Sequence, residues 1–402
     1  MISVQEAEKI VLAQSQNYGT EYVPLKEALG RITASKINAD RDFPPFDRVS
    51  MDGISIRFSD FKNGTRSFPI EDIQAAGQSQ KTLTNKNSCL EVMTGAVCPA
   101  NCDTVIRYED LEISDGIAKI MIDDIGEFQN VHAKGLDRNE GEVIMTKNHL
   151  VRASEIAVLA TVGAAQVEVY KRPKVAIISN GDELVRVDHE PLPHQIRRSN
   201  VYAIEAVLKG WNIDADLFHL ADNEDEIFSS LQDILQSYDI LLLSGGVSMG
   251  KYDYLPDAMN KLGVELLFHK VQQRPGKPFW FGRFQNQKLV FAFPGNPVST
   301  FMCSIRYFIP FFKKCMGLNP STPFRAQLGA DFKFKPPLQY FLQVKLSTDN
   351  ALIAHPLIGH GSGDLANLVD VDGFLELPED RTEFSKGEVF PFWAIGGSSG
   401  RF

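Results

Sequence analysis

Two acidic residues and a glycine-rich segment form the first candidate site. Residues 244–250 read SGGVSMG and follow an apolar run at 240–243, and glycines at such a place let backbone amides approach a ligand oxygen. Asp253 lies just beyond this segment, and Glu183 lies just beyond another apolar run. Two carboxylates beside an oxyanion-binding loop are what a hydrated magnesium ion that bridges phosphate oxygens requires. We therefore expect Asp253 and Glu183 to bind Mg²⁺.

Each of these features also has a simpler explanation. A tight turn from a strand to a helix needs glycines with positive φ angles, whether or not a ligand binds there. A solvated loop acid or a helix-capping acid would account for either carboxylate taken singly. If the segment does bind an oxyanion, the residues expected to contact it are Ser244, Gly245, Gly246 and Ser248.

Two proline-containing turns are further candidates for oxyanion binding. Residues 274–278 read RPGKP and place two cations, Lys277 among them, on a rigid turn, although a plain surface turn would have the same sequence. Residues 293–299 read FPGNPVS and lie between a predicted strand and a predicted helix, with free amides at the helix start. A simple helix start is the alternative here. The candidate contacts in the second turn are Pro294, Gly295 and Pro297.

The order of strands and helices predicts how these segments meet. Strand patterns alternate with helix patterns, and the predicted elements are a strand at 174–179, a helix from the N-cap candidate Ser199 through Val207, a strand at 216–220, a helix at 224–235, and strands at 240–243 and 288–292. Such alternation predicts a doubly wound parallel sheet. Ligands bind beyond the carboxyl ends of the strands in such sheets, where Glu183, Asp222 and the glycine-rich segment fall.

The chain is too long for one hydrophobic core, so we expect an α/β multidomain protein. Proline at positions 44 and 45 ends a helical pattern that begins at Met1, and short alternating segments follow it. The expected domains are a discontinuous N-terminal linker and helical domain at 1–46 and 132–171, a small inserted β-rich domain at 47–131, an α/β domain at 172–316, and a small C-terminal β domain at 317–402.

Composition limits the classes of partner. A net charge of -10 and a pI near 5.4 leave no basic footprint for nucleic acid. Neither a membrane span nor a secretory signal is apparent, so we expect a cytoplasmic protein. The five cysteines fit reduced thiols, because Cys98 and Cys102 have no second Cys/His pair at zinc spacing.

Six motifs in order give the sequence a family resemblance. They are SMDG at 50–53, MTGA at 93–96, NGDEL at 180–184, SGGVSMG at 244–250, RPGKP at 274–278 and FPGNPVS at 293–299. Over nearly its whole length the chain resembles the molybdopterin molybdenumtransferases. This resemblance implies a four-domain subunit whose sheet domain is of the molybdopterin-binding type, and a homodimer with its active site between that domain and the partner's N-terminal region. The positions carried over are Asp52, Thr94, Asp137, Glu183, Asp222, Asp253, Lys277, Pro294 and Pro297.

The resemblance also implies a reaction. Adenylylated molybdopterin and molybdate would yield molybdenum cofactor and AMP with the help of Mg²⁺, and the upstream adenylyltransferase is a candidate delivery partner. Glu183, Asp253, Asp52 and Lys277 would be the catalytic residues. Four departures from the family's usual residues concern the anion contacts, namely Lys251, Leu136, His132 and Gln343.

Two other functions compete with this one. A molybdopterin adenylyltransferase shares the sheet domain and its glycine loop, so the fold alone cannot separate them. The flanking N- and C-terminal regions favour the molybdenumtransferase, because they have no role in an adenylyltransferase. A non-catalytic dimeric scaffold is the second alternative, and the retained Glu183 and Asp253 argue against it.

Overall fold

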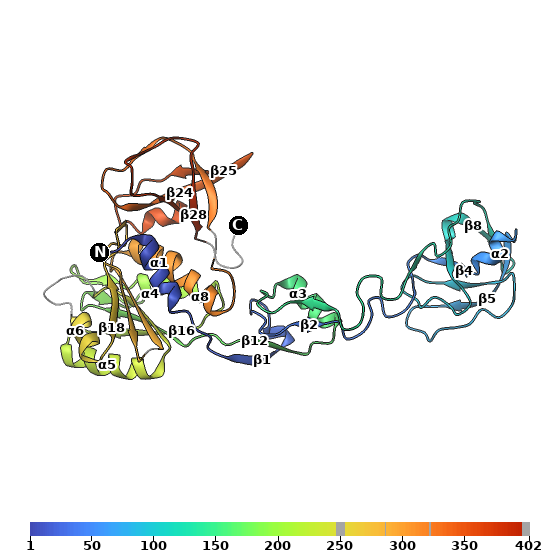
Figure 1. Ribbon diagram of the computed structural model, residues 1–402, viewed down its shortest axis with the longest axis horizontal. Helices are drawn as coiled ribbons and strands as arrows, with labels where there is room; N and C mark the ends of the chain where they lie inside the picture. The colour runs from blue at the N-terminus through green and yellow to red at the C-terminus, as the bar shows by residue number, and fades with distance from the viewer. Residues whose placement is uncertain (247–253, 286, 321–322, 396–402) are drawn as a thin grey trace. The chain divides into compact units, whose positions relative to one another are not determined.

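The computed structural model describes residues 1–246, 254–285, 287–320 and 323–395. The chain divides into two compact units, each built from separated segments (Figure 1). The first unit contains Met1–Ala34, Asn148–Arg152 and Gln166–Phe402, and the second contains Ser35–Lys147 and Ala153–Ala165. Within the described ranges, no helix is long and apolar enough to cross a bilayer.

A six-stranded sheet forms the centre of the first unit. Its order is β16-β13-β17-β21-β20-β18. The strands are β13 (Val175–Asn180), β16 (Ala215–Leu220), β17 (Ile240–Ser244), β18 (Glu265–His269), β20 (Trp280–Phe284) and β21 (Lys288–Phe293). The first four in the order run parallel, which confirms the predicted sheet. At one edge β20 pairs antiparallel with β21, and β18 pairs antiparallel with β20. The sheet is therefore mixed.

Helices cover both faces of this sheet. They are α1 (Val4–Ala13), α4 (Asn200–Lys209), α5 (Glu224–Ser237), α6 (Tyr254–Lys261), α7 (Pro297–Cys303), a π-helical segment (Ser304–Phe308) and α8 (Ile309–Cys315). Alternate residues of β13 enter different cores, because successive strand side chains point to opposite faces. Ile177 packs in the cluster that includes α1, α4, α7 and α8 residues, whereas Ile178 packs in the cluster with α5 and α6 residues.

The C-terminal part of the first unit is a small closed β-sheet. Its strands are β22 (Phe324–Leu328), β24 (Gln339–Asp349), β25 (Ala351–Pro356), β26 (Gly373–Leu377) and β28 (Val389–Ala394). The order β24-β25-β22-β28-β26 closes because β26 also pairs with β24. Two short pairs accompany it, β19 (Gln273–Arg274) with β24 and β23 (Phe332–Lys333) with β27 (Glu383–Phe384). Buried Arg306 joins this part to the helices through an ion pair of 3.2 Å with Glu376.

The second unit contains another six-stranded sheet, with the order β7-β4-β6-β5-β9-β8. Its strands are β4 (Gly53–Ile56), β5 (Ser67–Gln74), β6 (Cys89–Val92), β7 (Thr104–Arg107), β8 (Leu111–Ser114) and β9 (Ile117–Ile120). Other elements of the unit are β2 (Ile37–Asn38), β3 (Arg48–Val49), α2 (Phe58–Lys62), a 3-10 helix (Tyr108–Asp110), β10 (Val131–His132), β11 (Val143–Met145) and α3 (Ala153–Thr161). The helical spacing predicted from residue 153 is confirmed by α3.

The N-terminal segment differs from the prediction. The pattern from Met1 to Pro44 predicted helix, but the only α-helix there is α1. β1 (Thr20–Pro24) instead pairs antiparallel with β12 (Gln166–Tyr170), which lies far along the chain. Residues such as Tyr22 and Val23 suit an extended backbone, and a partner strand from beyond the inserted sheet makes that conformation favourable. Local spacing could not reveal such a partner.

Candidate functional site

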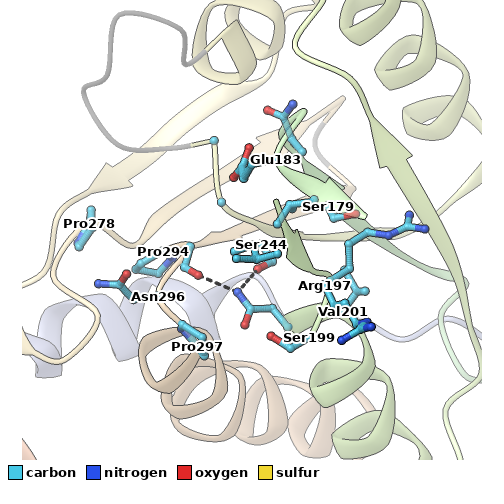
Figure 2. Close-up of a pocket in the computed structure, with 18 residues that line it drawn as sticks. Ser179, Glu183, Arg197, Ser199, Val201, Ser244, Pro278, Pro294, Asn296 and Pro297 are labelled. Atoms are coloured by element: carbon cyan, nitrogen blue, oxygen red, sulfur yellow. Dashed lines mark hydrogen bonds between the residues drawn. The ribbon is translucent and has the colours of Figure 1, made fainter. Parts of the chain in front are cut away.

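A cavity of about 450 Å³ lies at the carboxyl ends of β13, β17 and β21 (Figure 2). Its lining residues come from five segments of the sheet domain: Ser179, Asn180, Glu183 and Leu184; Ile196 to Val201; Ser244, Gly245 and Gly246; Pro278; and Pro294 to Pro297. β14 (Leu184–Val185) and β15 (Ile196–Arg197) form one side of it. The fold therefore brings the first strand's turn, residues 244–246 of the glycine-rich segment and the FPGNPVS turn into one cavity.

Asn200 connects two of these segments. Its side-chain amide donates hydrogen bonds to Ser244 Oγ at 2.8 Å and to the Gly295 carbonyl at 2.7 Å, drawn as dashed lines in Figure 2. Asn200 is the first residue of α4, so the amino end of this helix also faces the cavity. Unpaired backbone N–H groups and the helix dipole make such an end favourable for anions.

The two glycines after β17 have backbone conformations that favour glycine, and Gly246 also lies close to neighbouring side chains. Gly245 and Gly246 both have positive φ angles, at +93° and +69°. A Cβ on Gly246 would lie 2.2 Å from Leu255 Cδ1 and 2.9 Å from Asn180 Oδ1. The tight turn is therefore confirmed, and Ser244, Gly245 and Gly246 line the cavity. Oxyanion binding by this segment stays a prediction.

The turn after β13 directs Glu183 toward the cavity. A Cβ on Gly181 would lie 2.4 Å from Glu183 Oε2, so the carboxylate folds back over the glycine. Asp182 and Asp222 bond each other reciprocally: the Asp222 amide donates to Asp182 Oδ1 at 3.0 Å, and the Asp182 amide to Asp222 Oδ2 at 3.4 Å. Asn180 donates to Asp222 Oδ1 at 2.8 Å. Asp222 thus holds the turn that carries Glu183 and is not itself a lining residue.

Two arginines that were not among the predicted site residues line the cavity. Arg197 donates its Nε to the His189 carbonyl at 3.1 Å. The Nε of Arg198 is buried and has no hydrogen-bond partner among the described residues. Burial lowers the pKa of nearby His219, and the positive charge of Arg198 is the next largest cause of this shift. The sequence signal that could have identified these two residues is the arginine pair just before the N-cap candidate Ser199, because nearby cations favour an anion bound at a helix start.

The FPGNPVS turn contacts the C-terminal part of the unit. Asn296 Nδ2 donates to Ser362 Oγ at 2.8 Å, and the Val298 amide donates to the Ser362 carbonyl at 3.1 Å. Thr300 Oγ donates to the Pro294 carbonyl inside the turn. The loop around Ser362 therefore supports one wall of the cavity, although it was not among the predicted site residues.

Lys277, Ser248 and Asp253 were also predicted to belong to the site. Lys277 is exposed and does not line the cavity, although neighbouring Pro278 does. Asp253, Ser248 and the departure Lys251 lie outside the described residues. Within the described ranges, no three His, Cys, Asp or Glu residues form a group able to hold a metal.

The site residues predicted from the N-terminal region lie in the second unit. Asp52 accepts a hydrogen bond of 2.6 Å from the Thr94 amide, and this bond lowers the pKa of the Asp52 carboxyl. The SMDG and MTGA motifs are therefore neighbours. Asp137 lies 3.1 Å from Nε2 of His132, one of the departures.

Gln343 and the cysteines have structural contacts. Gln343 accepts from Asn367 Nδ2 at 3.0 Å, and its carbonyl accepts from the Leu357 amide at 2.9 Å. All five cysteines are free thiols, as expected. Burial raises the pKa of Cys98 to about 11.

Comparisons with known proteins cover almost the whole chain. Three family profiles match it: the MoeA N-terminal region (domain I and II) at residues 2–163, the probable molybdopterin binding domain at 176–314, and the MoeA C-terminal region (domain IV) at 325–395. A molybdopterin biosynthesis MoeA protein from Pyrococcus horikoshii has a similar crystal structure, with a TM-score of 0.83 and 27% identity, covering 98% of this chain and 100% of that one.

Named relatives agree with the profiles. A molybdopterin molybdenumtransferase from Bacillus subtilis is 30% identical, covering 99% of this chain and 95% of the relative. A molybdopterin molybdenumtransferase from Synechocystis sp. is 41% identical over 401 residues, covering 98% of this chain and all of the relative. On this full-length similarity, the chain belongs to the molybdopterin molybdenumtransferase family.

Proposed function

We propose that this protein inserts molybdate into adenylylated molybdopterin and releases AMP in a magnesium-dependent reaction that produces molybdenum cofactor. The observation that carries this proposal is the cavity at the strand ends, where a carboxylate, two glycines, two arginines and the amino end of α4 meet in a chain of this family. Relatives that match over the full length are named molybdenumtransferases, so the adenylyltransferase and scaffold alternatives are not favoured.

The residues of the cavity would act mainly by positioning and charge. The backbone amides at Gly245, Gly246 and the start of α4 would bind phosphate oxygens, and Arg198 would supply the positive charge that a pyrophosphate needs. Asn200 would keep the two turns at a fixed separation. Pro294, Gly295 and Pro297 would hold the oxyanion from the opposite side.

Glu183 and Asp253 would bind the magnesium ion. The ion would neutralise pyrophosphate charge during cleavage, and carboxylate oxygens are the ligands it prefers. Glu183 lines the cavity, and its carboxylate lies over Gly181. Lys277 is exposed beside Pro278, so we propose that it meets the substrate at the entrance and not inside the cavity.

Magnesium-dependent AMP release is the direct test of this function. Purified protein incubated with adenylylated molybdopterin, molybdate and Mg²⁺ should release about one AMP per pterin converted, and removal of divalent ions with a chelator should stop it. Added Mg²⁺ should restore the rate. The measurement is chromatographic quantification of AMP. ATP consumption in the presence of molybdopterin would instead favour an adenylyltransferase, and unchanged AMP release after exhaustive chelation would disprove the magnesium role.

We propose a homodimer in which Asp52, Thr94 and Asp137 complete the partner's active site. These residues belong to the second unit, whereas the candidate active-site cavity belongs to the first and is lined by none of them. Light scattering is expected to give twice the mass of the 44.8 kDa chain. Full activity at a concentration where only the single-chain mass is found would refute the shared site. We further propose a cytoplasmic location, with the upstream adenylyltransferase as delivery partner.

A further inference from the structure

A second cavity, of about 780 Å³, lies in the first unit at the opposite ends of the sheet strands. It is lined by Glu21, Arg31, residues 171–175, residues 214–216, Ser237 and Tyr238. Val175 begins β13 and Asn180 ends it, so this cavity and the candidate active site are roughly 15–20 Å apart along the strand. Glu21 belongs to β1, which pairs with β12 (Figure 1).

Two arginines in this cavity have unused donors. Arg31 has a side chain that is 9% exposed, and its Nη2 binds Glu21 Oε1 at 2.5 Å and the Tyr170 carbonyl at 2.9 Å. Its Nε is buried without a hydrogen-bond partner. Nη2 of Arg172 is likewise buried and unpartnered, and no carboxylate in the described part of the chain lies within ion-pair distance of this guanidinium. Buried N–H groups of charged side chains are rarely left unpaired.

The charges of the cavity leave the two arginines incompletely neutralised. Four cationic side chains line it, Arg31, Lys171, Arg172 and Lys174, against three carboxylates, Glu21, Asp214 and Asp216. Glu21 is paired with Arg31, and Asp216 accepts the Tyr238 hydroxyl at 2.7 Å. Burial first, and the charge of Arg31 second, lower the pKa of Arg172 to about 10, while Asp214 and Glu21 only partly offset this.

We infer that Arg31 and Arg172 form a binding site for a small tetrahedral oxyanion, separate from the active site. Arg31 Nε and Arg172 Nη2 are buried, so the two side chains would turn toward the cavity to donate to the oxygens of the anion. Guanidinium groups match oxyanions in charge and in geometry. Phosphate, sulfate and molybdate share this chemistry. The inference does not depend on the proposed reaction, since the cavity shares no residue with the candidate active site.

Equilibrium dialysis with labelled inorganic phosphate at constant ionic strength tests the site. The wild-type protein should bind one phosphate per chain in this cavity. Arg172→Gln should bind that phosphate with an affinity reduced roughly tenfold or more. Arg198→Gln, which alters the other cavity, and Lys335→Gln, which removes an exposed charge elsewhere, should both retain it. Competition by sulfate, molybdate and acetate then identifies the preferred anion, with planar acetate expected to be the weakest competitor.

Equal phosphate binding by wild type and Arg172→Gln would overturn the inference. If Arg172→Gln melts early, Arg172→Lys retains the charge and the stem but loses the planar fork, and it should still bind phosphate roughly tenfold more weakly. Crystals of the wild-type protein grown with selenate should show an anomalous peak between the two guanidinium groups. A cavity that contains only water at tens of millimolar selenate would overturn it as well.

Discussion

Replacing Glu183 by Gln is expected to lower AMP release by roughly a hundredfold to a thousandfold while leaving the fold intact. Glutamine has nearly the same shape, so it can occupy the space over Gly181 that the carboxylate fills. The change removes one negative charge from the proposed metal site, and such a loss typically costs several kcal/mol of electrostatic stabilisation, each 1.4 kcal/mol being about tenfold in rate. Single-turnover AMP release is the measurement.

The matched control for this variant is Glu190→Gln. Glu190 is an exposed acid of the same connecting segment that does not line the cavity, so its replacement changes the net charge equally. Its AMP release should equal that of the wild type, and both variants should melt within a degree or two of it, since such substitutions usually change stability by about 0.5 kcal/mol or less. Near-normal turnover by Glu183→Gln would remove this residue from the mechanism. A similar loss in both variants would indicate a long-range charge effect.

Gly53→Ala is expected to have the largest effect on stability. An added Cβ would lie 1.8 Å from the Ile106 carbonyl oxygen and 2.8 Å from Arg107 Cα, both of which are backbone atoms of β7. Gly53 pairs with Val92 on one side and with Arg107 on the other, so β4 cannot shift without disturbing both ladders. We expect a loss of roughly 3 kcal/mol or more in the unfolding free energy of the second unit.

Differential scanning calorimetry tests this expectation, with Gly116→Ala as the control. Gly116 lies in the same unit and also has a positive φ angle, but a Cβ there would meet nothing within 4 Å. Its replacement should cost only about 1 kcal/mol, from the backbone conformation alone. If the two variants melt alike, close approach of the backbones is not the reason for glycine at position 53. Because Asp52 precedes Gly53, its hydrogen bond to Thr94 should weaken along with the strand.

Gln343, one of the four departures from the family pattern, lies in the C-terminal part of the first unit, which contacts the FPGNPVS turn through Ser362. Gln343 supports this region through Asn367 and through the Leu357 amide, both neutral contacts. Arg197 and Arg198 are the cationic side chains among the lining residues of the cavity. His132, another of the departures, brings a titratable ring beside Asp137 in the second unit.

The predicted division into domains at 1–46 with 132–171, 47–131, 172–316 and 317–402 stays a proposal.

The sequence by itself determined the local elements of the sheet domain and the turns that follow them. Strands such as β13 and β17 are runs of apolar residues, and the turns after them contain glycines whose positive φ angles few other residues adopt. These signals depend on neighbours in sequence, so a pattern of residues is enough to predict them. Parallel order then places the strand ends at one edge, where the predicted Glu183 and residues 244–246 of the glycine-rich segment line one cavity.

The tertiary structure alone decided which distant residues meet. Asn200 bridges Ser244 and Gly295, and Ser362 binds the turn that contains Asn296. The pairing of β1 with β12 replaced a predicted helix, and it also placed Arg31 in the cavity with Arg172. Such contacts are set by the packing of segments far apart in the chain, whose side chains are compatible with many partners until the fold selects one.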